Sequence, residues 1–187
     1  MVDAATFRGY GGVLLTNGHL TYFGGMWPQE VINDRINPIF VLEALAVILG
    51  TLTWGSLFFG KKIIVRSDSS NTCGAFNKLK SENASLRLLA HLWAQCQESF
   101  QFEGLLFHCP GKDNQCADIA SRVEAGDVMQ SLYAELASYG LGEVTVSYTD
   151  IIWRANSISA SLLDVLSTMS SEASETRLRS KEHSALT

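Results

Sequence analysis

Two apolar runs near the amino terminus are separated by a strong turn signal. Residues 9–15 and 19–26 have the length and the aromatic and aliphatic content of strands, and Asn17-Gly18 stands between them. Both turn residues tolerate positive φ, so the pattern predicts a tight β-hairpin. Residues 2–3 are predicted to end the strand that leads into it.

Helical and strand-like patterns then alternate along the chain. Apolar residues surround the segment from Ile39 to about Trp54 almost completely, which is typical of a helix packed on a sheet. The order of elements predicts an α/β fold, in which a mixed five-stranded sheet is flanked by helices. The other predicted elements are strands at 62–66 and 102–109 and helices at 69–79, 83–100 and 115–123.

The last third of the chain has a weaker pattern. Residues 125–142 and 155–168 are helix candidates, and residues 143–148 between them are a strand candidate. Residues 169–187 are rich in serine, glutamate and arginine and carry few large apolar side chains, so we expect them to be disordered. The predicted organisation is a main domain at 1–124, a C-terminal helical extension at 125–168 and a disordered tail at 169–187.

The uncharged stretch at residues 44–59 raises the question of a membrane span. It is shorter than the ~20 residues that cross a bilayer, and glycine and threonine interrupt it. We therefore expect a buried helix of a globular domain and no membrane partner. The amino terminus also lacks the basic region and apolar run of a secretory signal.

Composition and charge narrow the class of protein. Hydrophobic residues make up 47% of the chain and charged residues 18%, which is typical of a globular protein. The net charge of −5 argues against the broad basic surface of a dedicated nucleic-acid binder. Residues 1–124 hold ten basic and eleven acidic side chains, however, so if several of these acids bind metal, the remaining surface is mildly positive.

The cysteines point to a reducing compartment. No two of them have C-x-x-C spacing, which argues against a zinc knuckle. The simplest interpretation is that all four are reduced thiols of an intracellular protein, with cytoplasm and nucleus both left open. They are Cys73, Cys96, Cys109 and Cys116.

Four acidic residues stand out by their context. Asp3 precedes the glycine-rich hairpin, Glu43 is the only charge within an apolar helix, Asp68 ends an apolar strand, and Asp118 lies one turn into a helix. A buried carboxylate is costly unless it is paired, hydrogen-bonded or metal-bound. Four converging carboxylates would repel one another without a cation, and hard oxygen ligands suit Mg²⁺ or Mn²⁺.

Each of these acids also has a purely structural interpretation. Glu43 is placed to form a hydrogen bond near the start of its helix, and Asp68 is placed to cap the helix that follows it. Asp118 has the i, i+4 spacing that pairs it with Arg122. The metal-binding hypothesis therefore depends on all four acids arriving in order in suitable elements.

Four segments together carry a family resemblance: VDAATFRGYGGVLL, INPIFVLEALAVILGTLTW, KIIVRSDSSNT and HCPGKDNQCADIASR. With these segments the chain resembles the ribonuclease H domain attached to retroelement reverse transcriptases, in particular those of DIRS-like and gypsy-like elements. The resemblance covers roughly residues 2–122. Its most specific piece is PGKDN-x-x-AD-x-x-SR at residues 110–122, followed by LE-x-x-A at residues 42–46.

This resemblance implies a ribonuclease H-like fold and a metal-dependent endonuclease. The family cuts the RNA strand of an RNA/DNA hybrid with two divalent ions, Mg²⁺ or Mn²⁺. By the resemblance, Asp3, Glu43, Asp68 and Asp118 match the four catalytic, metal-binding carboxylates. The implied partners are an RNA/DNA hybrid and a reverse transcriptase domain of the same element.

Polar residues beside these acids are candidates for substrate contacts. Hydroxyl, amide and cationic side chains bind the phosphates and 2′-hydroxyl groups of nucleic acids. Helix capping, turn formation and ordinary surface charge explain the same residues equally well. The candidates are Ser69, Asn71, Lys112, Asn114 and Arg122.

An alternative function stays open. A catalytically inactive module of the same fold would serve as a spacer or as a protein-binding remnant of a retroelement polyprotein. The four retained acids favour the enzyme, because a decayed copy has no physical reason to keep repelling carboxylates. A proofreading-type exonuclease would need Asp-x-Glu where the chain has Asp3-Ala4-Ala5, and an integrase-type site would need glutamate in place of Asp118.

Overall fold

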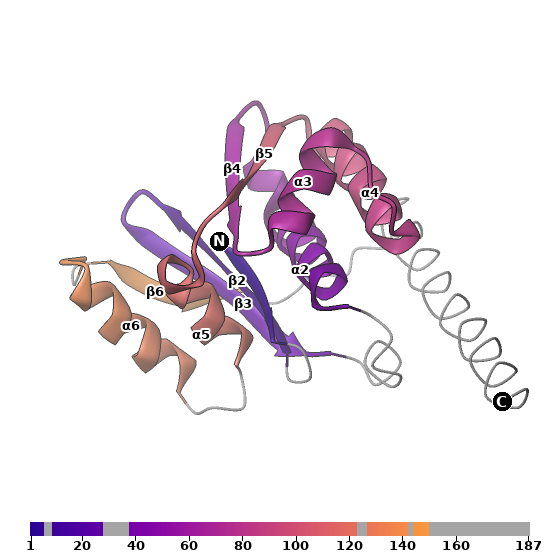
Figure 1. Ribbon diagram of the computed structural model, residues 1–187. Helices are drawn as coiled ribbons and strands as arrows, with labels where there is room; N and C mark the ends of the chain where they lie inside the picture. Colours follow the sequence, from indigo (N-terminus) through magenta and orange to yellow (C-terminus); the bar gives the residue numbers. More distant parts are fainter. Residues whose placement is uncertain (6–8, 28–37, 123–126, 142–143, 150–187) are drawn as a thin grey trace, which may run out of the picture.

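The strands of the computed structural model divide into two sheets (Figure 1). The structure describes residues 1–5, 9–27, 38–122, 127–141 and 144–149. The first sheet has the order β1-β2-β3-β6, and only its β3–β6 pair is parallel. The second sheet pairs β4 with β5 in parallel. The strands are β1 (Val2–Ala5), β2 (Gly9–Thr16), β3 (His19–Met26), β4 (Lys62–Ser67), β5 (Glu103–His108) and β6 (Thr145–Tyr148).

The hairpin between β2 and β3 forms at the predicted turn. Asn17 and Gly18 have φ values of 50° and 74°, and Thr16 pairs with His19 on either side of them. Positive φ at both central residues matches the right-handed twist of the two strands.

Helices pack on both faces of the first sheet and on one face of the second (Figure 1). The first group packs in a core with β1, β4 and β5, and the second group packs with the outer parts of β2, β3 and β6. The first group is α2 (Ile39–Trp54), α3 (Ser70–Lys78) and α4 (Ala84–Phe100), and the second is α5 (Gln115–Ser121) and α6 (Val128–Ser138). Two single 3₁₀ turns, η1 (Gly55–Leu57) and η2 (Gly111–Asp113), complete the described elements.

Alternation along the hairpin explains how one pair of strands serves two cores. Phe23 packs in the core with α2, whereas Leu20 and Val13 pack in the core with α5 and α6. Successive side chains of a strand point to opposite faces of the sheet. Phe23 and Leu20 are three positions apart in β3, so they lie on opposite faces.

The apolar helix α2 is central to the first core. It belongs to the one window in the described residues, Ile39–Leu57, that is long and apolar enough to cross a membrane. In the fold 78% of that window is buried, which matches the predicted buried helix.

The α/β class and the predicted order of helices and strands are confirmed. The single five-stranded sheet is not, because no ladder of hydrogen bonds joins β1 to β4 in the part of the chain that is described. The strand predicted at 143–148 is β6, and it extends the first sheet by pairing with β3. The predicted helix at 155–168 and tail at 169–187 lie outside the described residues.

Candidate metal centre

Two of the four predicted acids are buried where β1 lies between β2 and α2. Asp3 is 6% exposed and Glu43 is 5% exposed. The backbone N–H of Ala4 donates a hydrogen bond to Oε1 of Glu43 at 3.3 Å, which ties the first turns of α2 to β1. The apolar sequence of α2 forces this helix into the core, and Glu43 is carried inside with it.

Asp68 completes a group of three carboxylates. It follows β4 directly and is exposed, so it closes the group on the solvent side. Asp3, Glu43 and Asp68 each offer an oxygen atom, and these three atoms all lie within 4.8 Å of one another. The structure therefore brings together three of the four predicted acids, from three elements that are distant in sequence.

The electrostatics of this group favour a cation. Burial, with a smaller contribution from the neighbouring Asp3 and Asp68, raises the pKa of Glu43 to about 9, although the hydrogen bond from the Ala4 N–H opposes this shift. Burial also raises the pKa of Asp3 to about 6, although a hydrogen bond from Ser121 opposes this shift. Packed carboxylates without a cation hold protons in this way because their negative charges are poorly solvated and repel one another.

One oxygen of the group has no hydrogen-bond partner among the described residues. Oε2 of Glu43 is buried, and no donor of the described part of the chain reaches it. A buried acceptor without a partner costs about 1–3 kcal/mol, more if it is charged. Three converging carboxylates with one unsatisfied oxygen are a donor set that fits Mg²⁺ or Mn²⁺.

Asp118 does not join the group of three. It lies on α5, and its Oδ1 accepts hydrogen bonds from Nε and Nη2 of Arg122 at 2.9 and 2.7 Å. The i, i+4 ion pair foreseen as the structural interpretation of Asp118 is therefore present. Asp118 nevertheless lies close enough to Asp3 to raise the pKa of Asp3.

Ser121 connects α5 to the acids, and the sequence interpretation did not single it out. Its hydroxyl lies 2.8 Å from Oδ2 of Asp3 and 2.9 Å from the backbone carbonyl of Asp118. The hydroxyl donates to the carboxylate of Asp3 and so ties this acid to α5. The serine belongs to the AD-x-x-SR segment, which was its only signal in the sequence.

Glycines of β2 allow α5 to come this close. A Cβ atom built on Gly11 would lie 2.3 Å from the carbonyl carbon of Ala120 and 2.4 Å from the backbone nitrogen of Ser121. A Cβ atom on Gly9 would lie 2.6 Å from the carbonyl oxygen of Ser121. The glycine-rich sequence of β2 thus has a packing role, in addition to suiting a hairpin.

Four of the five candidate substrate residues lie on accessible surface. Ser69 is half-buried and caps α3, because its hydroxyl accepts a hydrogen bond from the Thr72 N–H at 3.3 Å. Asn71 in the first turn of α3 and Lys112 in η2 are exposed, as is Arg122 in its ion pair with Asp118.

Asn114 differs from the other candidates because it is 1% exposed. Its Nδ2 donates a hydrogen bond to the carbonyl oxygen of Val2 at 3.0 Å. In the described fold this side chain makes a structural contact that holds β1 beside the metal-site candidate, and its contact with substrate stays a prediction. The cause is the turn at η2, which directs this side chain into the protein.

No protein-family model, curated protein or solved structure matches this chain.

Proposed function

We propose that this chain is a metal-dependent endonuclease that cuts the RNA strand of RNA/DNA hybrids. The observation that carries the proposal is the group formed by Asp3, Glu43 and Asp68, with ligand atoms within 4.8 Å and one buried oxygen without a partner. The sequence resemblance to retroelement ribonuclease H domains supplies the substrate class. A reverse transcriptase domain of the same element is the partner that this resemblance favours.

The proposed roles follow from where each side chain lies. Asp3, Glu43 and Asp68 would hold divalent ions, Mg²⁺ or Mn²⁺. Bound there, such ions would supply an activated water and charge stabilisation at the leaving oxygen. The chain contributes placement and charge, through Ser121 and the Ala4 N–H, which orient Asp3 and Glu43.

The region around Asp68 offers contacts for a nucleic-acid backbone. A Cβ atom built on Gly111 would lie 3.5 Å from Oδ2 of Asp68, so η2 and the exposed Lys112 border the acids. Lys112, Asn71 and Arg122 are the proposed phosphate contacts. On substrate binding, the guanidinium of Arg122 would leave Asp118 and bind a phosphate group. Asp118 would then be available to bind a second metal ion.

The inactive module remains the second candidate, and one observation favours it. Asp118 is held by Arg122 instead of facing the other acids. A chain that uses Asp118 only for this ion pair would retain a single ion site and would not cleave.

Cleavage of a labelled RNA/DNA hybrid tests the proposal. The purified full chain is incubated with the hybrid in Mg²⁺ and, separately, in Mn²⁺, beside Asp68→Asn and Asp113→Asn. Asp113 is an exposed acid of the same neighbourhood that lies outside the group of three, so it is the matched control.

We expect the RNA strand to be cut by the wild-type chain and by Asp113→Asn. Asp68→Asn should lose about a thousandfold in rate, which corresponds to roughly 4 kcal/mol of transition-state stabilisation. A folded wild-type chain that binds Mg²⁺ in calorimetry but cuts nothing would support the inactive module. A folded chain that neither binds the ion nor cuts would overturn the metal centre itself.

A further inference from the structure

The sheet formed by β4 and β5 has two unlike faces. On one face Leu106 is buried in the core that α3 and α4 share with the sheet. The opposite face carries large apolar side chains that stay exposed: Ile64 is 67%, Leu105 51% and Phe107 58% exposed. Groups of exposed apolar side chains mark interaction sites. We call this surface the open face; it consists of Lys62, Ile64, Arg66, Glu103, Leu105 and Phe107.

The charge that is left free on the open face is positive. Lys62 and Glu103 occupy paired positions of the two strands and form an ion pair of 3.1 Å. Arg66 is exposed and has no ion-pair partner among the described residues. Its register partner on β5 is Phe107, so a free guanidinium group and an exposed aromatic ring occupy neighbouring positions.

An exposed aromatic ring beside a free arginine suits single-stranded nucleic acid. Every base has a π-face that can stack on an aromatic side chain, and arginine adds attraction to phosphate and to the base itself. Stacking of this kind requires unpaired bases, because the bases of a duplex already stack on one another. The open face therefore fits a single strand better than it fits a duplex.

The pair of Arg66 and Phe107 is close to the three acids. Asp68 follows Arg66 by two residues, which corresponds to at most about 7 Å along the backbone. A Cβ atom built on Gly111 would lie 3.5 Å from Oδ2 of Asp68, so the exposed Lys112 in the same turn also borders this acid. A strand that meets the acids at Asp68 can therefore continue directly onto the open face.

We propose that the open face binds a single-stranded tail of the RNA strand, where that strand leaves the RNA/DNA hybrid held at the acids. Phe107 stacks on a base and Arg66 binds a phosphate, while Ile64 and Leu105 contact the next base. The inference rests on the proposed function, because the strand at the acids is the one that is cut and is therefore RNA. The preferred substrate is then a hybrid with an RNA tail and not a blunt hybrid.

A second copy of the chain is a poorer occupant of the open face. The face carries two cations, Lys62 and Arg66, and one acid, Glu103. Two copies packed face to face would bring together surfaces of the same net charge, which opposes their association. Phosphate groups have the complementary charge.

Fluorescence anisotropy with the full chain tests the proposal. The measurement is made in EDTA, so that binding is recorded without metal-dependent cutting. The probes are a blunt RNA/DNA hybrid and the same hybrid with a single-stranded tail of about eight nucleotides. In separate probes the tail extends the RNA strand at its 5′ end, the RNA strand at its 3′ end, or the DNA strand.

The variants alter only exposed side chains. Phe107→Ala removes the ring, Phe107→Tyr keeps a ring, and Arg66→Ala removes the free cation. Phe59→Ala is the matched control, because Phe59 is 68% exposed but precedes β4, at the end of the strand away from Asp68. Circular dichroism establishes that each variant is folded.

We expect an RNA tail at one of its two ends to tighten binding about tenfold over the blunt hybrid. Phe107→Ala should abolish this gain, whereas Phe107→Tyr and Phe59→Ala should keep it. Arg66→Ala should weaken binding of the tailed hybrid and reduce its salt dependence by about one phosphate contact.

The proposal is overturned if neither RNA tail tightens binding, if a DNA tail does so equally, or if Phe107→Ala keeps the gain. Self-association that Phe107→Ala abolishes, seen by sedimentation, would identify a second copy as the occupant and would also overturn it. Failure of the proposed nuclease is distinguishable from these outcomes. A chain that binds the RNA tail through Phe107 but cuts nothing in Mg²⁺ or Mn²⁺ would support tail binding and refute only the nuclease.

Discussion

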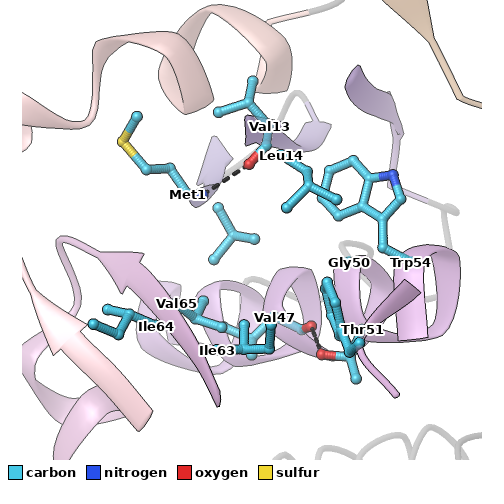
Figure 2. Close-up of a pocket in the computed structure, with 12 residues that line it drawn as sticks. Met1, Val13, Leu14, Val47, Gly50, Thr51, Trp54, Ile63, Ile64 and Val65 are labelled. Carbon is cyan, nitrogen blue, oxygen red and sulfur yellow. Dashed lines mark hydrogen bonds between the residues drawn. The ribbon is translucent and has the colours of Figure 1, made fainter. Parts of the chain in front are cut away.

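The two ends of β1 differ in how they meet β4. At the carboxyl end, Asp3 and Asp68 bring ligand atoms within 4.8 Å of each other and of Glu43. Near Met1 and Val2 an apolar pocket of about 40 Å³, whose lining includes Val47 and Ile63, lies between the two strands (Figure 2), and no ladder joins them in the residues described.

The difference comes from the neighbouring elements and not from the two strands. Around Asp3, three hydrogen bonds tie β1 to other elements. Ala4 bonds Glu43 of α2, Asp3 bonds Ser121 of α5, and Val2 bonds Asn114, the residue before α5. Near Met1, the described hydrogen bonds of the backbone are those with Val13 of β2. The comparison teaches that the geometry of the acids is set by contacts outside β1 and β4, so disturbing those contacts should loosen the acid end first.

The largest expected effect concerns the charge of Glu43. Its pKa in the fold is about 9, above its ordinary value of 4.5, so the folded state holds the proton more tightly than the unfolded state. Its contribution to stability is therefore fully present below about pH 4.5 and is lost as the pH rises towards 9. Glu43→Gln removes this loss, so the metal-free variant should exceed wild type by up to about 4 kcal/mol at pH 8 and by little at pH 5.

Urea unfolding in EDTA at several pH values measures this gap. Glu98→Gln, on the exposed side of α4, is the matched control and should show no such trend. Added Mg²⁺ should stabilise the wild type and leave Glu43→Gln unchanged. A stability difference between the two proteins that does not change with pH would contradict the assignment of a buried carboxyl group whose charged form is poorly solvated.

The next effect tests the close approach of α5 to β2. Gly11→Leu places a side chain where the Ala120 carbonyl carbon lies 2.3 Å from the new Cβ, so α5 must move. We expect a loss of about 3 kcal/mol in the free energy of unfolding, because a packed backbone contact is forced apart.

Gly74→Ala is the control for Gly11→Leu, because a Cβ there meets open space on α3. It should stabilise the protein by about 0.5–1 kcal/mol through helix propensity. Equal stability of Gly11→Leu and wild type would show that α5 does not pack on β2 as described.

The smallest effect concerns the hydroxyl of Ser121. Ser121→Ala removes the donor to Oδ2 of Asp3 and should cost about 1 kcal/mol of stability, together with a severalfold loss in Mg²⁺ affinity by calorimetry. Ser121→Thr should restore the affinity, and Ser138→Ala, whose hydroxyl bonds only the Glu135 carbonyl on the surface of α6, should leave it unchanged. An unchanged affinity in Ser121→Ala would limit this serine to a role in packing.

Local patterns were sufficient for most elements. The continuous apolar run predicted α2 within its observed bounds, Ile39–Trp54, and Asn17-Gly18 predicted the hairpin. These signals depend on neighbours in sequence, through hydrophobic spacing and turn conformation. Helix capping was one interpretation of both Asp68 and Ser69, and Ser69 is the residue that caps α3; several adjacent residues had suitable side chains, so the local sequence did not choose between them.

Contacts between distant residues were not predictable in the same way. Asn114 was expected to touch substrate, but its hydrogen bond to Val2 spans 112 positions in sequence. Metal binding and an ion pair with Arg122 were the two interpretations of Asp118. The local sequence was compatible with both, and the structure shows the ion pair.

By itself, the sequence determined the α/β class, the positions of the main helices and strands, and three acids that come together. These follow from hydrophobic periodicity, turn residues and the cost of burying a carboxylate. Only the tertiary structure decided that Asp118 pairs with Arg122, that Ser121 and Asn114 hold β1, and that no ladder joins β1 to β4 in the residues described. The physical reason is that these features depend on the distance at which elements pack against one another. Gly11 allows α5 to approach β2 closely, but the local sequence around it does not specify which element approaches.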